Sequence, residues 1–196
     1  MAAKDLKRYR RKGPINTTRL LVEALRAEGV EGLTLLDIGG GVGVVHHELL
    51  AAGVREVVHV DAAPEYIEAA RGEAERRGHG ARVHFRRGDF VEIAPDLSAA
   101  GVVTLDRVIC CYGDMPALVG ASAAKAERLY GVVYPRDGVP MKALIPMANL
   151  VFRLRRRTFR VFLHASAAVD AEIRAQGLRR RSTRYTPLWQ VVVYGR

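Results

Sequence analysis

The sequence lacks several features that would place it in common protein classes. It has no uninterrupted apolar run of the roughly 18 residues that a transmembrane helix needs, so we expect no membrane-spanning segment. Its basic start lacks the apolar stretch of a secretory signal. Only two cysteines are present, Cys110 and Cys111, and adjacent cysteines cannot build a disulfide framework. Together these absences favour a reducing, cytoplasmic setting.

Acidic residues are scarce at both ends of the chain. The formal net charge is +10, of which residues 1–19 carry +6 and residues 151–196 carry +9, leaving −5 for the middle. Basic ends favour an anionic partner, such as a nucleic acid, an anionic membrane surface or an acidic small molecule. A solvated surface in an arginine-rich protein explains them equally well. We predict a basic, flexible arm over residues 1–13 and a single domain over 14–196.

Apolar runs of strand length alternate with helical segments along the chain, and Gly or Pro separates many of them. This alternation predicts an α/β fold, a doubly wound and mostly parallel sheet with helices on both faces. The predicted strands are 33–38, 56–61, 82–87, 101–105, 128–134, 159–164 and 189–194. The predicted helices are 16–28, 44–52, 64–77, 116–128 and 166–175.

A glycine-rich turn follows the first predicted strand, in the stretch DIGGGVG from Asp37 to Gly43. Glycines allow a tight turn and a close approach of backbone to ligand, and the next helix offers free N–H groups. Acids follow the next two strands, as Asp61 and as Asp89 with Phe90. Ligands bind at the carboxyl ends of strands in such sheets. An acid such as Asp61 can accept both ribose hydroxyls of an adenosine there. Asp89 can accept from an adenine amino group while Phe90 packs on the ring.

LLDIGGGVG resembles the first motif of class I S-adenosylmethionine-dependent methyltransferases, while VDAAPEYIEAAR and RRGDFVE resemble the second and third. The resemblance implies S-adenosylmethionine as cofactor and a Rossmann-like sheet of seven strands, with an antiparallel C-terminal strand beside the fifth. A nicotinamide-binding protein is the rival, but Val44 stands where its third glycine or alanine is expected. The cofactor-binding residues expected from the resemblance are Asp37, Gly39, Gly41, Gly43, Asp61, Ala62, Asp89, Phe90 and Asp106.

The stretch DRVICCYGDM, Asp106 to Met115, and the ending TPLWQVVVYGR are similar to bacterial relatives of magnesium-protoporphyrin O-methyltransferase. This implies methyl transfer, above all O-methylation, to a small apolar or acidic acceptor of tetrapyrrole-like or quinone-like kind. The D/N-P-P-Y/F motif of amino-methylating nucleic-acid enzymes is absent. An RNA or protein methyltransferase, or a non-catalytic nucleic-acid-binding relative, stays open as the alternative. Nucleic acid is the less favoured partner, because the arginines lack interleaved aromatics.

Tyr112 and Asp106 are the predicted catalytic residues. Tyr112 is the better placed general base for a hydroxyl acceptor, with His46, His47 and Asp114 as further candidates. A carboxylate acceptor is already ionised and needs no base. Asp106 is expected to be an electrostatic neighbour of the sulfonium or an anchor of the loop.

The two cysteines are expected to form a soft part of the pocket wall, with Cys111 and Tyr112 close to the substrate. No metal site is predicted, because adjacent cysteines lack the C-x-x-C spacing and no second pair exists.

The segment 136–158 contains MKALIPMANLVFRLRRR, which is apolar and then abruptly basic. One interpretation is a lid or membrane-surface insertion over an apolar, acidic substrate, with Met147 in contact with that substrate. The other is a helix packed on the sheet with an exposed basic end.

Overall fold

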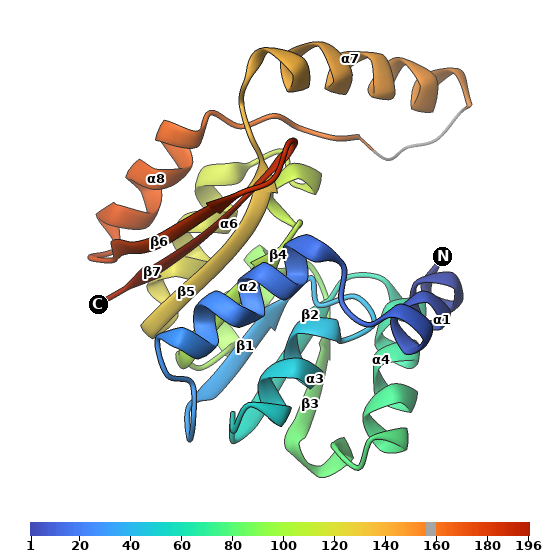
Figure 1. The fold of residues 1–196 in the computed structure, drawn as a ribbon, viewed down its shortest axis with the longest axis vertical. Helices are drawn as coiled ribbons and strands as arrows, with labels where there is room; N and C mark the ends of the chain where they lie inside the picture. Colours follow the sequence, from blue (N-terminus) through green and yellow to red (C-terminus); the bar gives the residue numbers. More distant parts are fainter. Residues whose placement is uncertain (156–159) are drawn as a thin grey trace.

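A seven-stranded sheet forms the centre of the computed structural model, which describes residues 1–155 and 160–196 (Figure 1). Its strand order is β3-β2-β1-β4-β5-β7-β6. Neighbours among β1 to β5 are parallel, whereas β7 is antiparallel to β5 and β6. The predicted sheet, with an antiparallel strand beside the fifth, is therefore confirmed. The strands are β1 (Thr34–Ile38), β2 (Glu56–Asp61), β3 (Val83–Arg87), β4 (Ala100–Asp106), β5 (Ala126–Pro135), β6 (Arg179–Tyr185) and β7 (Trp189–Gly195).

Helices cover both faces of this sheet, and the apolar strands are buried between them (Figure 1). Successive residues of a strand point to opposite faces, so Leu35 and Val102 pack in one core while Leu36 and Val103 pack in the other. Continuous apolar runs suit strands that are buried on both sides. One face carries α2 (Asn16–Ala27), α3 (Val44–Ala51) and α4 (Pro64–Arg76), and the other carries α5 (Phe90–Ile93), α6 (Met115–Ala124) and α8 (Ser166–Ala175).

The strand order reverses between β1 and β4, where Ile38 lies beside Leu105. In doubly wound sheets this reversal opens a crevice at the carboxyl ends of the strands, and ligands bind in it. The glycine-rich turn after β1 and the stretch after β4 therefore meet at one place. The acids that end β2 and β3 lie along the same edge of the sheet.

The last two strands differ in part from the prediction. Residues 160–165 contain no strand, and Phe159, the first residue of the predicted strand, lies outside the described residues. Arg179–Tyr185 forms β6 instead and pairs with β7 through a tight turn, in which Thr186 N donates to Trp189 O at 2.8 Å. The loop between β6 and β7 is short, so pairing these two strands costs little loop-closure entropy. Pairing residues 160–164 with β7 would close a much longer loop.

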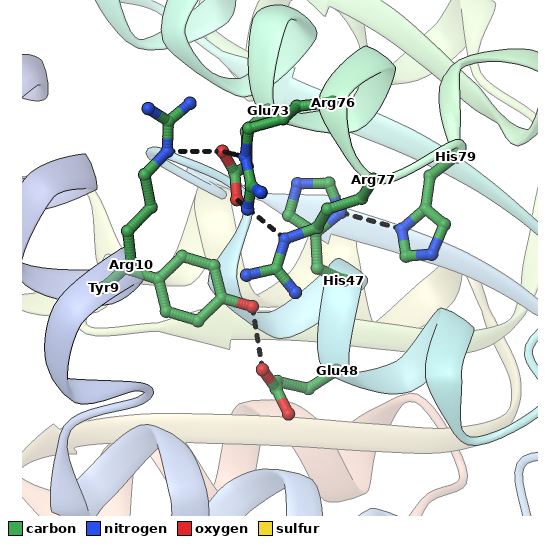
Figure 2. Close-up of polar contacts among 8 residues, drawn as sticks. All are labelled: Tyr9, Arg10, His47, Glu48, Glu73, Arg76, Arg77 and His79. Carbon is green, nitrogen blue, oxygen red and sulfur yellow. Dashed lines mark hydrogen bonds and ion pairs between the residues drawn. The ribbon is translucent and has the colours of Figure 1, made fainter.

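The start of the chain forms a helix, α1 (Ala2–Lys12), beside α4, and not the predicted flexible arm (Figure 1). Tyr9 is only 2% exposed, and its hydroxyl donates to Glu48 Oε1 at 2.7 Å (Figure 2). Arg10 Nε donates to Glu73 Oε2 at 2.8 Å. Glu48 of α3 and Glu73 of α4 thus accept hydrogen bonds from Tyr9 and Arg10 of α1. These contacts hold the basic segment against the domain as a helix.

Glu73 is the centre of this docking (Figure 2). Its side chain is wholly buried and accepts hydrogen bonds from Arg10, Arg76 and Arg77. Burial alone would raise the pKa of Glu73, but the three guanidinium groups hold that pKa well below its usual range. One carboxylate therefore joins α1 to the C-terminal end of α4.

We expect Glu73→Gln to lower the free energy of unfolding by about 2 kcal/mol, because charge-assisted hydrogen bonds are lost. Urea unfolding measures this difference. Because the pKa of Glu73 is lowered in the folded state, its contribution is complete above the pKa of an unfolded glutamate, about 4.3. It declines as the pH falls below that value.

Glu75→Gln on the exposed side of the same helix is the matched control, with an expected change below about 0.5 kcal/mol. Equal losses in the two variants would contradict the anchoring role of Glu73.

Candidate cofactor and acceptor site

The glycine-rich turn between β1 and α3 is held tightly by its neighbours. Gly39 has a φ of +61°, and a Cβ there would lie 2.5 Å from Val108 Cγ2. A Cβ at Gly40 would lie 2.6 Å from both Asp37 Oδ2 and His59 Nδ1. Side chains are excluded at both positions, so the backbone of the turn stays partly exposed at the switch point.

Asp61 connects the end of β2 to this turn. Its Oδ2 accepts from Gly41 N at 3.0 Å and its Oδ1 from Ala63 N at 2.9 Å, while Ala62 between them is exposed. The side chain is partly exposed, and each carboxylate oxygen keeps a second lone pair for a ligand. Burial raises the pKa of Asp61, although both backbone donors oppose that shift. This geometry suits the predicted acceptor of ribose hydroxyls.

Asp89 follows β3 and Tyr112 follows β4, and their side chains meet although β2 and β1 lie between these strands in the sheet. Asp89 Oδ1 caps α5 by accepting from Val91 N at 2.9 Å, and the Tyr112 hydroxyl lies 3.0 Å from each carboxylate oxygen. The structure therefore brings these two predicted residues together. Phe90 is only 5% exposed and packs in the core, so its ring does not offer the adenine-stacking face that we expected.

Tyr112 is placed as a hydrogen-bond donor. Partial burial, together with the hydrogen bond to Asp89, raises the pKa of Tyr112 to about 12. The phenol is therefore protonated at neutral pH, which disfavours the predicted role of general base.

Asp106 anchors the loop after β4. Thr18 Oγ1 donates to its Oδ2 at 2.5 Å, and Arg107 Nε lies 3.5 Å from its Oδ1. Arg107 has a φ of 64°, an uncommon conformation for a residue with a side chain, and the turn it makes sets Val108 against Gly39. Of the two roles predicted for Asp106, the geometry supports the loop anchor.

Asp37 lies wholly buried beneath the glycine-rich turn and does not face the crevice. Thr104 Oγ1 donates to Asp37 Oδ1 at 2.9 Å, and His46 Nδ1 lies 3.2 Å from Asp37 Oδ2. Burial raises the pKa of Asp37 and lowers the pKa of His46 and of His59 to about 3. The expected direct contact between Asp37 and the cofactor is replaced by a supporting position under the loop.

The other three candidate bases, His46, His47 and Asp114, are also poorly placed to accept a proton from an acceptor in the crevice. His46 and His47 are completely buried, so an acceptor in the crevice does not reach them. Asp114 caps α6 by accepting from Ala117 N at 3.0 Å.

The two cysteines are free thiols with different surroundings. Cys110 is buried and Cys111 is exposed, and their Sγ atoms lie 3.8 Å apart. Both thiols point at the carbonyl oxygen of Arg107, at 3.5 Å and 3.7 Å. Cys110 thus belongs to the wall behind the loop, and a substrate contact of Cys111 stays a prediction.

A long helix, α7 (Val139–Leu154), follows the carboxyl end of β5 and stands apart from the sheet (Figure 1). Pro146 lies inside it. The exposed fraction of Met147 is 59%, and further exposed apolar side chains share the helix, namely Leu144, Leu150, Val151 and Leu154. None of the helices in the described ranges has the length and apolar character to cross a bilayer.

The segment after α7 returns to the loop that follows β4. Phe162 N donates to Cys110 O at 2.8 Å, and His164 Nε2 lies 2.9 Å from Tyr112 O. The side chain of Asn149 on α7 bonds both backbone groups of Val161, at 2.7 Å and 2.9 Å. These contacts tie α7 to the candidate site. Sequence reasoning missed Phe162 and His164 because it interpreted their alternating pattern as a strand.

Sequence reasoning also missed three partners of the predicted acids, Thr18, His59 and Thr104. One signal was available for His59, because it is the single polar residue inside the apolar run of its strand. A polar side chain at a core position needs a partner there.

Residues 35–129 match a family profile described as a methyltransferase domain. The matched segment is a methyltransferase domain, in agreement with the motifs that the sequence shares with class I S-adenosylmethionine-dependent methyltransferases. Its structure is similar to magnesium protoporphyrin IX methyltransferase from Synechocystis PCC 6803 with bound SAH, at a TM-score of 0.73 and 19% identity over 92% of this chain and 81% of that chain. An O-methyltransferase family protein from Burkholderia thailandensis gives a TM-score of 0.72 and 18% identity over 94% of this chain and 57% of that chain. At such identities the likeness shows the methyltransferase fold alone.

The curated relatives include proteins named ribosomal protein L11 methyltransferase. The protein from Photobacterium profundum is 37% identical over 62 residues, which are 32% of this chain and 21% of the relative. The one from Edwardsiella ictaluri is 26% identical over 123 residues, covering 59% of this chain and 42% of the relative. This chain thus spans less than half the length of these relatives.

Asp61→Ala is expected to weaken S-adenosylmethionine binding by at least about tenfold, the equivalent of one good hydrogen bond to a charged group. Isothermal calorimetry measures the change, and circular dichroism checks that the variant stays folded without the contact to Gly41. Glu68→Ala on the exposed side of α4 serves as control. Unchanged affinity in folded Asp61→Ala would remove Asp61 from the site.

Proposed function

We propose that this protein transfers a methyl group from S-adenosylmethionine to a small acceptor with an apolar body and an acidic group, most simply at an oxygen. The hydrogen bond from Gly41 to Asp61 carries this proposal, because it fixes a ribose acceptor against the glycine-rich turn at the switch point. Asp89 continues the same edge of the sheet with a further carboxylate. The residues present therefore fit the cofactor.

The sulfonium of the cofactor, when bound, supplies the electrophilic methyl group. The chain has to orient the acceptor atom in line with that group and exclude water. Tyr112 is protonated, His46 and His47 are buried, and these positions do not supply a base to a hydroxyl acceptor. An acceptor that is already ionised, such as a carboxylate, suits this site because it needs no base.

α7 supports an acceptor that is both apolar and anionic. Its exposed apolar side chains share the helix with the exposed cations Lys142 and Arg153. The contacts of Phe162 and His164 hold the segment that returns from α7 on the loop of Tyr112. We therefore interpret α7 as a lid over the acceptor. The structural likeness to a magnesium protoporphyrin IX methyltransferase supports a tetrapyrrole-like acceptor only loosely, and a quinone-like one fits the same surface.

A screen with methyl-labelled S-adenosylmethionine tests the function directly. Tetrapyrroles with free carboxylates, quinones, phenols, RNA and ribosomal proteins are offered in parallel. We expect label in the carboxylate-bearing apolar compounds as a methyl ester, which base hydrolyses. A base-stable product would place the methyl group on a hydroxyl oxygen, a nitrogen or a carbon instead. Label confined to RNA or protein would overturn the proposed acceptor while leaving the methyltransferase activity intact.

The double variant of Met147 and Leu150 to Ser is expected to raise the KM for an apolar acceptor by about tenfold, because apolar contact with α7 is lost. The affinity for S-adenosylmethionine, from calorimetry, stays unchanged. Leu188→Ser, at an exposed apolar residue in the turn before β7, is the control. A fall in kcat alone, or equal effects in the control, would argue against the lid.

A protein acceptor is the second candidate, because the curated relatives carry the name ribosomal protein L11 methyltransferase. The ribosomal-protein arm of the screen separates it from the first.

A further inference from the structure

Four of the six histidines form a row beneath the glycine-rich turn. His59 Nδ1 lies 3.2 Å from His46 Nδ1, and the His46 ring contacts the His47 ring edge-on at 4.2 Å between centroids. His47 Nδ1 then lies 3.1 Å from His79 Nδ1, near the surface (Figure 2). The inner end of the row is the buried carboxylate of Asp37.

Three ligand atoms converge at that inner end. His46 Nδ1 is 3.2 Å from Asp37 Oδ2 and 3.2 Å from His59 Nδ1, and His59 Nδ1 is 4.0 Å from Asp37 Oδ2. A point equidistant from three atoms with these separations lies about 2 Å from each of them, which is the length of a zinc–imidazole or zinc–carboxylate bond. The three residues are fully buried and group within one small space.

Hydrogen bonds alone satisfy this cluster poorly. A neutral imidazole nitrogen carries either one hydrogen or one lone pair, yet His46 Nδ1 has two close neighbours. The Nε2 atoms of His46 and His59 are also buried without a hydrogen-bond partner in the structure. A cation at the shared point would engage the lone pairs of all three atoms at once, and it would give the buried carboxylate a counter-ion.

We propose that Asp37, His46 and His59 bind a zinc-type transition-metal ion beneath the glycine-rich turn. Two imidazoles and one carboxylate suit zinc and its first-row neighbours rather than magnesium or calcium. Thr104 orients the carboxylate by donating to its other oxygen, as outer-shell partners of metal ligands do. The row through His47 to His79 gives the ion a path of imidazoles to the surface.

The ion would act on the loop and not on the methyl group. Gly40 is packed against Asp37 Oδ2 and His59 Nδ1, so the position of these ligands sets the position of the turn above them. The ligands come from β1, α3 and β2, and one ion would join all three elements. The proposal does not depend on methyl transfer, and its test has a readout of its own.

The whole protein, stripped with a chelator and dialysed, is titrated with Zn²⁺ and with Co²⁺. We expect one equivalent of Zn²⁺ to bind and to raise the midpoint of thermal unfolding. One equivalent of Co²⁺ should give the visible absorption of a low-coordinate site with nitrogen and oxygen ligands. Absence of stoichiometric binding in the folded wild-type protein would overturn the proposal without bearing on S-adenosylmethionine binding.

Variants locate the ion. Thr104→Val removes an outer-shell partner, so it is expected to weaken Zn²⁺ binding by about 10–100-fold. His59→Gln removes a ligand itself, so its effect is expected to exceed about 100-fold. His84→Gln is the matched control, because His84 pairs with Glu56 on the surface. Thr104→Val keeps the side-chain volume, so it remains informative if His59→Gln fails to fold. Binding unchanged in folded Thr104→Val and His59→Gln, or lost in His84→Gln, would place the ion elsewhere.

Discussion

Burial of one carboxylate at the end of the central strand constrains the whole candidate site. Asp37 lies in β1 with no exposure, so Thr104 from β4 and His46 from α3 must come close enough to partner it. The contact with His46 fixes the start of α3 relative to β1, and the glycine-rich turn connects these two elements. Desolvation of a carboxylate is costly unless it is paired, so this arrangement has little freedom to relax. The contacts of Asp37 therefore restrain the glycine-rich turn from its buried side.

The sheet and the order of its acids could be predicted from the sequence because both are set by local patterns. Apolar runs define β1 to β5 and β7, and the acids that end β2 and β3 follow them directly in the chain. The expected ribose acceptor Asp61 rests on this kind of information. Contacts across the fold carry no such signature. The hydrogen bonds from Thr18 to Asp106 and from Tyr112 to Asp89 join residues that are distant in sequence, and a single sequence holds no record of them.

Charge misled the prediction at the start of the chain, and alternation misled it near the end. The basic residues of 1–13 indicated a solvated arm, but Glu48 and Glu73 are placed by the fold to receive α1. The alternating residues of 160–164 indicated a strand, but their partner is the loop of Cys110 and Tyr112. Likewise, the proposed metal ligands Asp37, His46 and His59 come from three separate elements, so the spacing of residues in the sequence does not group them. In each case the deciding partner was remote in sequence.

The position of β6 at the edge of the sheet suggests a role for its arginines that requires no anionic partner. β6 has one unpaired edge, and an open edge of a sheet invites pairing with a strand of another molecule. Its sequence RRRSTRY places four arginines on that edge strand. Like charges on two approaching copies repel each other, so this row would keep the molecules from stacking edge to edge into aggregates. Such repulsion would account for part of the net charge of +10 without a role in recognition.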